Sequence, residues 1–268
     1  MNLKEIAKNK ERLSPGHRLC AGCAAGSIAR MVMNATENPA VVGCATGCLE
    51  VSTTIYPYTA WEDSFIHNAF ENAAATVSGV EAAYRALKRK GKVEEDYDFI
   101  AFGGDGGTYD IGFQSLSGAL ERGHDMLYVC YDNGAYMNTG IQRSSATPRG
   151  ANTTTSPAGE VIPGKQQYRK ELTDIVAAHG IPYVAQAAPW RPQDLMKKVK
   201  KAHDVKGPTF INILSPCPRG WRTNSEESIE ISKVASQTCF WPLFEIEEGE
   251  WSLNYEPNEK KPIEEWLK

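Results

Sequence analysis

The chain has 268 residues, of which 41% are hydrophobic, and a formal net charge of −4. It is long enough for one large α/β domain or two small ones. The mild negative charge offers no basic surface for nucleic acid or an anionic membrane, and no run of about 18 apolar residues could span a bilayer. The amino terminus is charged throughout and lacks the apolar stretch of a signal peptide, so we expect a cytoplasmic protein.

Strands and helices alternate along the chain. The clearest helix covers 70–90, where apolar side chains recur with the 3.6-residue period of an α-helix. This alternation predicts a mostly parallel, doubly wound sheet, the α/β fold in which ligands bind beyond the carboxyl ends of the strands. In chain order we expect a helix over 23–34, a strand over 41–45, the helix over 70–90, a strand over 99–103, a helix over 112–121, a strand over 126–131, a helix over 170–179, an extended segment over 181–187, a helix over 192–203 and a central strand over 209–214.

Two segments stand apart from this pattern. Residues 139–167 are polar and rich in Ser, Thr, Gly and Pro, and a loop of such length is usually functional or disordered. Because it follows candidate metal ligands, we expect an ordered lid or a subunit contact. We place one domain over 1–244 and a C-terminal tail over 245–268, which is acidic and irregular and is expected to wrap a neighbour or to be loosely held.

The sequence Gly104-Asp105-Gly106 stands just after one expected strand, and Asn133 just after the next. Mg²⁺ takes oxygen ligands in near-octahedral geometry, commonly one or two side chains together with phosphates. Asp105 can supply a carboxylate oxygen and Asn133 an amide oxygen, while glycines let the backbone approach a phosphate closely. The spacing therefore predicts a Mg²⁺-diphosphate site, and it resembles the diphosphate motif of thiamine diphosphate enzymes.

Four of the seven cysteines could form a second site. Cys20 and Cys23 form a C-x-x-C pair, and Cys48 and Cys217 each follow an expected strand, so loops at one sheet edge could bring all four together. In a reducing compartment such thiols favour metal binding or redox chemistry, and the spacing fits zinc or an iron-sulfur cluster equally. The other three, Cys44, Cys130 and Cys239, have apolar neighbours and are expected to pack in the core.

Further motifs run through most of the chain. They are G-H-R-L-C-A-G-C (16–23), A-T-G-C-L-E-V (45–51), Y-P-Y-T-A-W (56–61), F-E-N-A-A-A (70–75), G-D-G-G-T-Y-D-I-G (104–112), Y-D-N-G-A-Y-M-N-T-G-I-Q-R-S (131–144) and C-P-R-G-W (217–221). With these motifs, residues 17–243 resemble the thiamine-diphosphate-binding beta subunit of 2-oxoacid:ferredoxin oxidoreductases, most of all the pyruvate enzyme.

The resemblance implies the doubly wound sheet of thiamine-diphosphate-binding domains and a role for each motif residue. The family's reaction is oxidative decarboxylation of a 2-oxoacid to acyl-coenzyme A and CO₂, with electrons passed to ferredoxin. Asn138 would point at the thiazolium carbon and the substrate. By motif, Cys20, Cys23, Cys48 and Cys217 would hold a proximal [4Fe–4S] cluster, Asp105, Asn133 and the Ala135 carbonyl would bind Mg²⁺, and Gly104, Gly106 and Gly107 would line the diphosphate with them.

The same resemblance implies partner chains: a pyrimidine-domain alpha chain, a gamma chain and a ferredoxin-like delta chain, with coenzyme A and ferredoxin as reactants. The carboxylate that protonates N1′ of thiamine has no evident donor in this sequence, so we expect it on another chain. Glu62 and Asp63 depart from the family pattern near the expected active-site entrance and leave the substrate open, since relatives also use oxalate, branched-chain or aryl 2-oxoacids. Two further alternatives are a redox-free thiamine decarboxylase with structural zinc and a non-catalytic, zinc-stabilised binding module.

Overall fold

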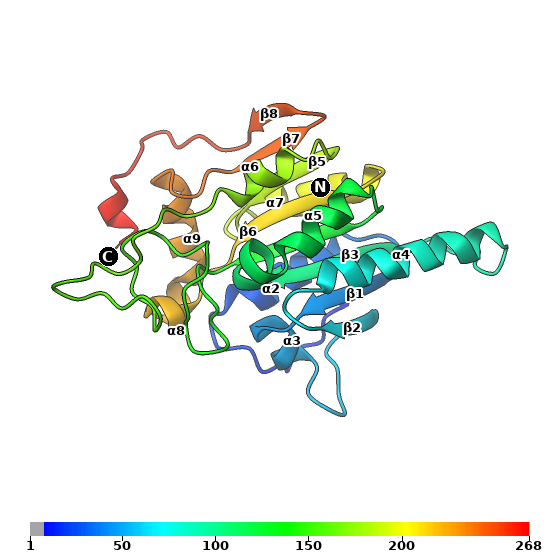
Figure 1. The fold of residues 1–268 in the computed structure, drawn as a ribbon, viewed down its shortest axis with the longest axis horizontal. Coiled ribbons are helices and arrows are strands. Elements are labelled where there is room, and N and C mark those ends of the chain that lie inside the picture. Colours follow the sequence, from blue (N-terminus) through cyan, green and yellow to red (C-terminus); the bar gives the residue numbers. More distant parts are fainter. Residues whose placement is uncertain (1–7, 268) are drawn as a thin grey trace.

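A single sheet of eight strands organises the computed structural model, which describes residues 8–267. The strands are β1 (Ala40–Ala45), β2 (Ser64–Asn68), β3 (Asp98–Gly104), β4 (Leu127–Asp132), β5 (Tyr183–Ala187), β6 (Thr209–Leu214), β7 (Phe244–Glu247) and β8 (Glu250–Leu253). Their order across the sheet is β2-β1-β3-β4-β6-β5-β7-β8 (Figure 1). The first six strands in this order are parallel, and β7 and β8 join antiparallel. The expected doubly wound α/β fold is confirmed.

Helices cover both faces of the sheet, with α4 and α5 on one face and α2 and α7 on the other (Figure 1). Both faces of the sheet are apolar and need cover, because successive side chains of a strand point to opposite faces. In β3, Phe99 and Ala101 pack on the α4 and α5 side, whereas Ile100 and Phe102 pack on the α2 and α7 side. The helices are α2 (Ala24–Asn34), α3 (Cys48–Thr53), α4 (Ala73–Arg89), the π-helix η1 (Gly106–Ile111), α5 (Phe113–Glu121), α6 (Leu172–Ala177), α7 (Pro192–Asp204), α8 (Pro218–Trp221), α9 (Ser228–Gln237) and the short 3₁₀ helices η2 (Ser225–Glu227) and η3 (Ile263–Glu265).

Every strand and helix expected from the sequence is present, with ends shifted by at most three residues. The expectation of an irregular tail was wrong for its first part, because β7 and β8 form a hairpin that extends the sheet from β5. The proposed boundary at 244/245 falls inside β7. Aromatic packing holds both parts of the tail: Trp251 stacks on Phe244 at 4.7 Å and Trp266 on Phe240 at 4.0 Å between ring centroids.

The long segment 139–167 is held by internal hydrogen bonds. The ammonium group of Lys165 is buried and donates to the carbonyl oxygens of Ser145 (3.1 Å) and Thr147 (2.6 Å). Antiparallel bridges join Thr153 to Ser156 and residue 158 to 163. An ordered segment was expected here, and its role as a lid or subunit contact stays a prediction. Within residues 8–267, no helix is both long enough and apolar enough to cross a membrane.

Candidate active site

The carboxyl ends of β1, β3, β4 and β6 lie side by side, and the loops that follow them hold the residues expected to bind cofactors. In Figure 1 these loops and α8 gather at one side of the sheet. One small cavity of about 30 Å³ lies among them. Its lining includes Cys48, Gly104, Asp105, Gly106, Gly107, Asn133, Ala135 and Asn138. Loops that are distant in sequence therefore meet at one place, as expected.

Asp105 is a fully buried carboxylate at the base of this cavity. Its Oδ1 accepts a hydrogen bond from the backbone N–H of Asn133 at 3.2 Å, and its Oδ2 accepts one from the hydroxyl of Ser144. Burial, and then repulsion from the nearby Asp132, raise the pKa of Asp105 well above its usual range. A carboxylate in this position is costly to keep ionised unless a cation approaches it.

Two polar groups, the Asn133 side-chain amide and the Ala135 carbonyl, converge beside Asp105. A terminal atom of the Asn133 side-chain amide lies 2.8 Å from the carbonyl oxygen of Ala135 and 2.9 Å from Oδ1 of Asp105. If this atom is the amide nitrogen, it donates a hydrogen bond to both oxygens. The hydrogen-bonding pattern favours the nitrogen at this position, and a 180° rotation of the amide would instead turn its oxygen toward the same two oxygens, as a bound cation would require. Neighbouring ligands of an octahedral Mg²⁺ ion are roughly 2.9 Å apart when Mg–O distances are about 2.0–2.1 Å, so the spacing fits Mg²⁺.

Gly106 and Gly107 begin the helical segment that follows β3. A Cβ on Gly106 would lie 2.4 Å from the ring of Tyr136, whose hydroxyl donates to the Gly106 carbonyl oxygen at 2.8 Å. A Cβ on Gly107 would lie 2.9 Å from the carbonyl oxygen of Phe70. The first turns form the π-helix, closed by a bond from the Gly112 N–H to the Gly107 carbonyl oxygen at 2.8 Å. The glycines thus have a packing requirement that sequence reasoning missed, besides leaving the helix amino terminus open to an anion.

The four candidate cluster cysteines also come together. Burial, and to a smaller extent negative charge on Cys217, Cys48 and Cys20, raise the pKa of the Cys23 thiol to about 11. The backbone N–H of Gly220 donates to Sγ of Cys217 at 3.3 Å, and the side chain of Asn138 forms a hydrogen bond with the Cys48 thiol. Among the residues that the structure describes, no group of three or more His, Cys, Asp or Glu side chains is arranged to hold a metal ion. The thiols therefore approach one another without closing around a single ion.

The remaining cysteines divide between core and surface. Cys44 in β1 and Cys130 in β4 are fully buried, as expected. Cys239 was wrongly assigned to the core, because it is exposed. It lies just beyond the end of α9 and has a left-handed backbone conformation, with a φ of 59°.

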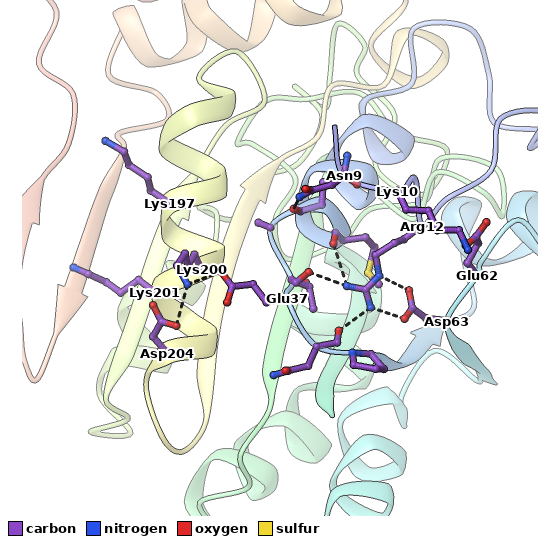
Figure 2. A pocket seen from close by; sticks show the side chains of 16 residues that line it. Asn9, Lys10, Arg12, Glu37, Glu62, Asp63, Lys197, Lys200, Lys201 and Asp204 are labelled. Carbon is purple, nitrogen blue, oxygen red and sulfur yellow. Dashed lines mark hydrogen bonds and ion pairs between the residues drawn. The ribbon is translucent and has the colours of Figure 1, made fainter. Parts of the chain in front are cut away.

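Glu62 and Asp63 are not near the cofactor residues, so that expectation was wrong. They line a hollow of about 1050 Å³ beside the amino ends of β1 and β2, at the opposite edge of the sheet (Figure 2). Glu62 pairs with Lys10 at 2.6 Å, and Asp63 pairs with the guanidinium of Arg12. The Asp63–Arg12 pair, which is largely buried, joins the amino-terminal segment to the start of β2.

Sequence reasoning missed several residues that support the site. Ser144 holds Asp105, and the indole N–H of Trp221 donates to the backbone carbonyl oxygen of Asn133 at 2.7 Å. Arg169 forms a buried ion pair with Asp132 at 2.6 Å. Ser144 and Trp221 lay inside quoted motifs, but no spacing rule connects them to their partners, which are 39 and 88 residues away.

A mostly parallel sheet whose carboxyl-edge loops join a carboxylate, an amide and a glycine-led helix defines an α/β protein that binds a cofactor phosphate. Residues 42–213 match the family model described as "Thiamine pyrophosphate enzyme, C-terminal TPP binding domain". The chain therefore belongs to the thiamine pyrophosphate enzymes and, by its relatives, to the beta subunits of 2-oxoacid:ferredoxin oxidoreductases.

Three relatives illustrate this membership. The chain is 54% identical over 277 residues to the pyruvate synthase subunit PorB of Thermotoga maritima. The alignment covers 100% of this chain and 86% of that protein. It is 56% identical over 261 residues to PorB of Methanocaldococcus jannaschii, covering 97% and 88%. It is 46% identical over 262 residues to the ketoisovalerate oxidoreductase subunit VorB of Pyrococcus abyssi, covering 97% and 84%.

A solved structure shares the fold. The 2-oxoglutarate:ferredoxin oxidoreductase from Magnetococcus marinus, solved with 2-oxoglutarate, coenzyme A and succinyl-CoA bound, aligns with a TM-score of 0.65 at 21% identity. The alignment covers 84% of this chain and 81% of that one.

Proposed function

We propose that this chain binds thiamine diphosphate through Mg²⁺, and a [4Fe–4S] cluster through four cysteines, in a complex that oxidatively decarboxylates a 2-oxoacid. Pyruvate is the first candidate substrate, with acyl-coenzyme A and CO₂ as products and ferredoxin as electron acceptor. The observation that carries the proposal is the convergence of the buried Asp105 carboxylate and the Ala135 carbonyl oxygen on one terminal atom of the Asn133 amide, at 2.9 and 2.8 Å, a spacing that ligands of one Mg²⁺ ion can also adopt.

The protein's share of the metal site would be these three oxygens. Asp105 contributes the negative charge that a divalent cation neutralises, and Ser144 and the Asn133 N–H orient its carboxylate. The diphosphate would complete the coordination shell while the N–H groups at the start of the π-helix face it. Gly104, Gly106 and Gly107 keep this surface free of side chains.

Cys20, Cys23, Cys48 and Cys217 would hold the cluster. A C-x-x-C pair and two further thiols, all near enough to Cys23 to affect its pKa, supply the four thiolates that such a cluster takes. The hydrogen bond from Gly220 to Cys217 favours the thiolate that iron requires. Burial opposes the free thiolate in Cys23, and iron would offset that effect.

Asn138 would orient the substrate between the two cofactors. Its exposed side chain lines the cofactor cavity and forms a hydrogen bond with the Cys48 thiol. When bound, thiamine diphosphate supplies the nucleophilic carbon and the electron sink for decarboxylation, and the cluster removes electrons one at a time. The chain's own contribution is to hold both groups at one sheet edge and to place an amide between them.

The proposed complex also contains a pyrimidine-domain alpha chain, a gamma chain and a ferredoxin-like delta chain, in the cytoplasm. Pyruvate is favoured because the two PorB proteins are 54% and 56% identical to this chain. The VorB protein at 46% identity makes a branched-chain 2-oxoacid the second candidate. The test uses the intact complex, purified without oxygen, and a panel of 2-oxoacids with viologen as electron acceptor.

We expect coenzyme A-dependent viologen reduction that is fastest with pyruvate. We also expect bound thiamine diphosphate and broad visible absorption that bleaches with dithionite. Fastest turnover with 3-methyl-2-oxobutanoate would show that the substrate is a branched-chain 2-oxoacid and not pyruvate. Zinc in place of iron, with decarboxylation but no viologen reduction, would contradict the redox role of the cysteines.

A further inference from the structure

We infer that Trp221 is a positioning residue that fixes the Mg²⁺-binding loop against the loop of the cluster ligand Cys217. Its hydrogen bond to Asn133 would hold the Mg²⁺ ligand in place. This inference rests on the proposed function, because it assigns a role to Trp221 in the same site. Trp221 is not a ligand of either cofactor. Its proposed effect is on the position of Asn133.

The two loops leave the sheet together. β4 and β6 are hydrogen-bonded neighbours, with Asp132 opposite Leu214 in the last paired position. Beyond the strands, the backbone N–H of Ser215 donates to the carbonyl oxygen of Asp132 at 2.7 Å. Residues 133–139 and residues 215–222 therefore begin side by side, one carrying the Mg²⁺ ligands and the other carrying Cys217.

Trp221 joins them at the metal ligand. Its indole N–H donates to the backbone carbonyl oxygen of Asn133 at 2.7 Å, while the backbone N–H of Asn133 donates to Asp105 at 3.2 Å. Asn133 is thus held on one side by the carboxylate that would bind Mg²⁺ and on the other by Trp221. A small rotation of this residue would move its side-chain oxygen out of the octahedral position.

The same short helix also contacts the cluster ligand and the loop of Asn138. The backbone N–H of Trp221 donates to the carbonyl oxygen of Cys217 at 2.8 Å, and that of Gly220 donates to its Sγ at 3.3 Å. A Cβ on Gly220 would lie 2.2 Å from Sδ of Met137, the residue before Asn138. α8 thus fits between the two loops with no space for a side chain at Gly220.

Trp221 is itself supported from the outside. Its ring meets the edge of Trp266 with 5.7 Å between centroids, and Trp266 stacks on Phe240 at 4.0 Å. The indole is therefore fixed by packing as well as by its hydrogen bond. A fixed donor orients its acceptor, whereas a mobile donor would follow it.

The test compares two Trp→Phe changes in the intact complex purified without oxygen. Trp221→Phe keeps an aromatic ring and removes the donor to Asn133. Trp190→Phe is the matched control, because Trp190 is also half-buried and its indole N–H donates to Ser236 at 2.9 Å, in a part of the chain without cofactor residues. Calorimetry measures thiamine diphosphate binding to the cofactor-stripped complex at limiting Mg²⁺.

We expect Trp221→Phe to weaken binding roughly three- to ten-fold, the effect of losing one buried hydrogen bond. The apparent KM for thiamine diphosphate should rise with little change in kcat at saturating cofactor, and added Mg²⁺ should restore binding. The iron content and the visible spectrum should stay unchanged. Trp190→Phe should bind the cofactor as the unmodified complex does.

A second pair of variants tests whether the close packing of α8 against the loop of Asn138 is needed for cofactor binding. Gly220→Ala is expected to weaken cofactor binding by forcing Met137 away, and Gly220→Ala with Met137→Ala is expected to recover it. Unchanged binding in Trp221→Phe, or an equal loss in both Trp variants, would overturn the positioning role while leaving the proposed function intact. An unmodified complex that binds no thiamine diphosphate would overturn the proposed function itself.

Discussion

At the scale of single residues, Asp105 illustrates a conflict between stability and cofactor binding. It is fully buried, and both burial and repulsion from Asp132 raise its pKa. A carboxyl group whose pKa is higher in the folded than in the unfolded state stabilises the fold below the unfolded pKa of about 4. That stability is lost as the pH rises toward the folded pKa, since the buried group must then ionise.

The first prediction follows from the raised pKa of Asp105. Asp105→Asn should raise the free energy of unfolding of the cofactor-stripped complex at neutral pH, because the amide is never charged. It should also lower the affinity for Mg²⁺ and thiamine diphosphate by more than roughly 100-fold, since even groups that only orient metal ligands contribute 10–100-fold. Thermal unfolding from pH 4 to pH 8 and calorimetric titration measure the two effects. A variant that is destabilised and still binds the cofactor would contradict both.

The proximity of Asp105 and Asn133 could be predicted from the sequence, but the residues that hold them in place could not. Asp105 and Asn133 each follow a strand, and parallel strands end at one edge, so their proximity could be predicted from the strand pattern. Ser144 could not be predicted, because its bond to Asp105 depends on how a long loop folds back. Trp221 likewise meets Asn133 only through the path of α8.

At the scale of secondary-structure elements, the glycines at the start of the π-helix are set by close packing. Gly106 faces the ring of Tyr136, where a Cβ would come within 2.4 Å. Gly79 is a useful contrast, since it lies exposed in the middle of α4, and a Cβ added there would have no atom within 4 Å. The same substitution should therefore have opposite effects at the two positions.

The second prediction compares these glycines. Gly106→Ala should lower the free energy of unfolding by about 1–3 kcal/mol through overpacking, and it should reduce thiamine diphosphate binding. Gly79→Ala should raise that free energy by about 0.5–1 kcal/mol, since alanine favours a helix interior. Chemical denaturation of both variants measures the difference. An unchanged free energy of unfolding in Gly106→Ala would show that the Tyr136 ring moves aside without cost.

The third prediction concerns the attachment of the long loop to the sheet. Arg169 pairs with buried Asp132 at 2.6 Å, lies 4.7 Å from the ring centroid of Trp241, and donates to the hydroxyl of Tyr109 at 2.6 Å. Arg169→Met would leave the Asp132 carboxylate buried without its cation, at a cost of about 3–5 kcal/mol. Lys206→Met, which removes an exposed pair with Asp125, should change stability little. Equal effects in denaturant unfolding would refute a structural role for the buried pair.

Elements could be predicted from sequence where burial produces a regular apolar pattern. β3, β4 and β6 are buried on both faces and read as short apolar runs. β2 was missed because it is an edge strand of mixed polarity, S-F-I-H-N, with only one buried residue. The β7 and β8 hairpin was missed because β7, F-E-I-E, alternates apolar and acidic residues over only four positions, and all four residues of β8, E-W-S-L, are exposed.

At the scale of the whole molecule, the sheet places one part of the proposed catalytic site at its carboxyl edge. The proposed ligands of the metal and the diphosphate line the cavity, whereas only Cys48 of the four proposed cluster ligands does. The cavity measures only about 30 Å³, whereas pockets that enclose drug-sized ligands measure about 300–1,000 Å³. Asp105 is the one carboxylate among its lining residues, and it would be occupied by Mg²⁺.

The last prediction follows from this incompleteness. Thiamine needs a carboxylate at N1′ of its pyrimidine, and a surface that excludes water from the reacting carbon. Since the cavity provides neither, this chain purified alone should show no 2-oxoacid oxidation, although it should retain weak Mg²⁺-dependent binding of diphosphate compounds. Adding the alpha chain should restore thiamine diphosphate affinity and, with the remaining chains, coenzyme A-dependent viologen reduction. Asp105→Asn serves as the control, because its defect should persist in the assembled complex. Robust turnover by the single chain would show that the whole catalytic site lies within these 268 residues.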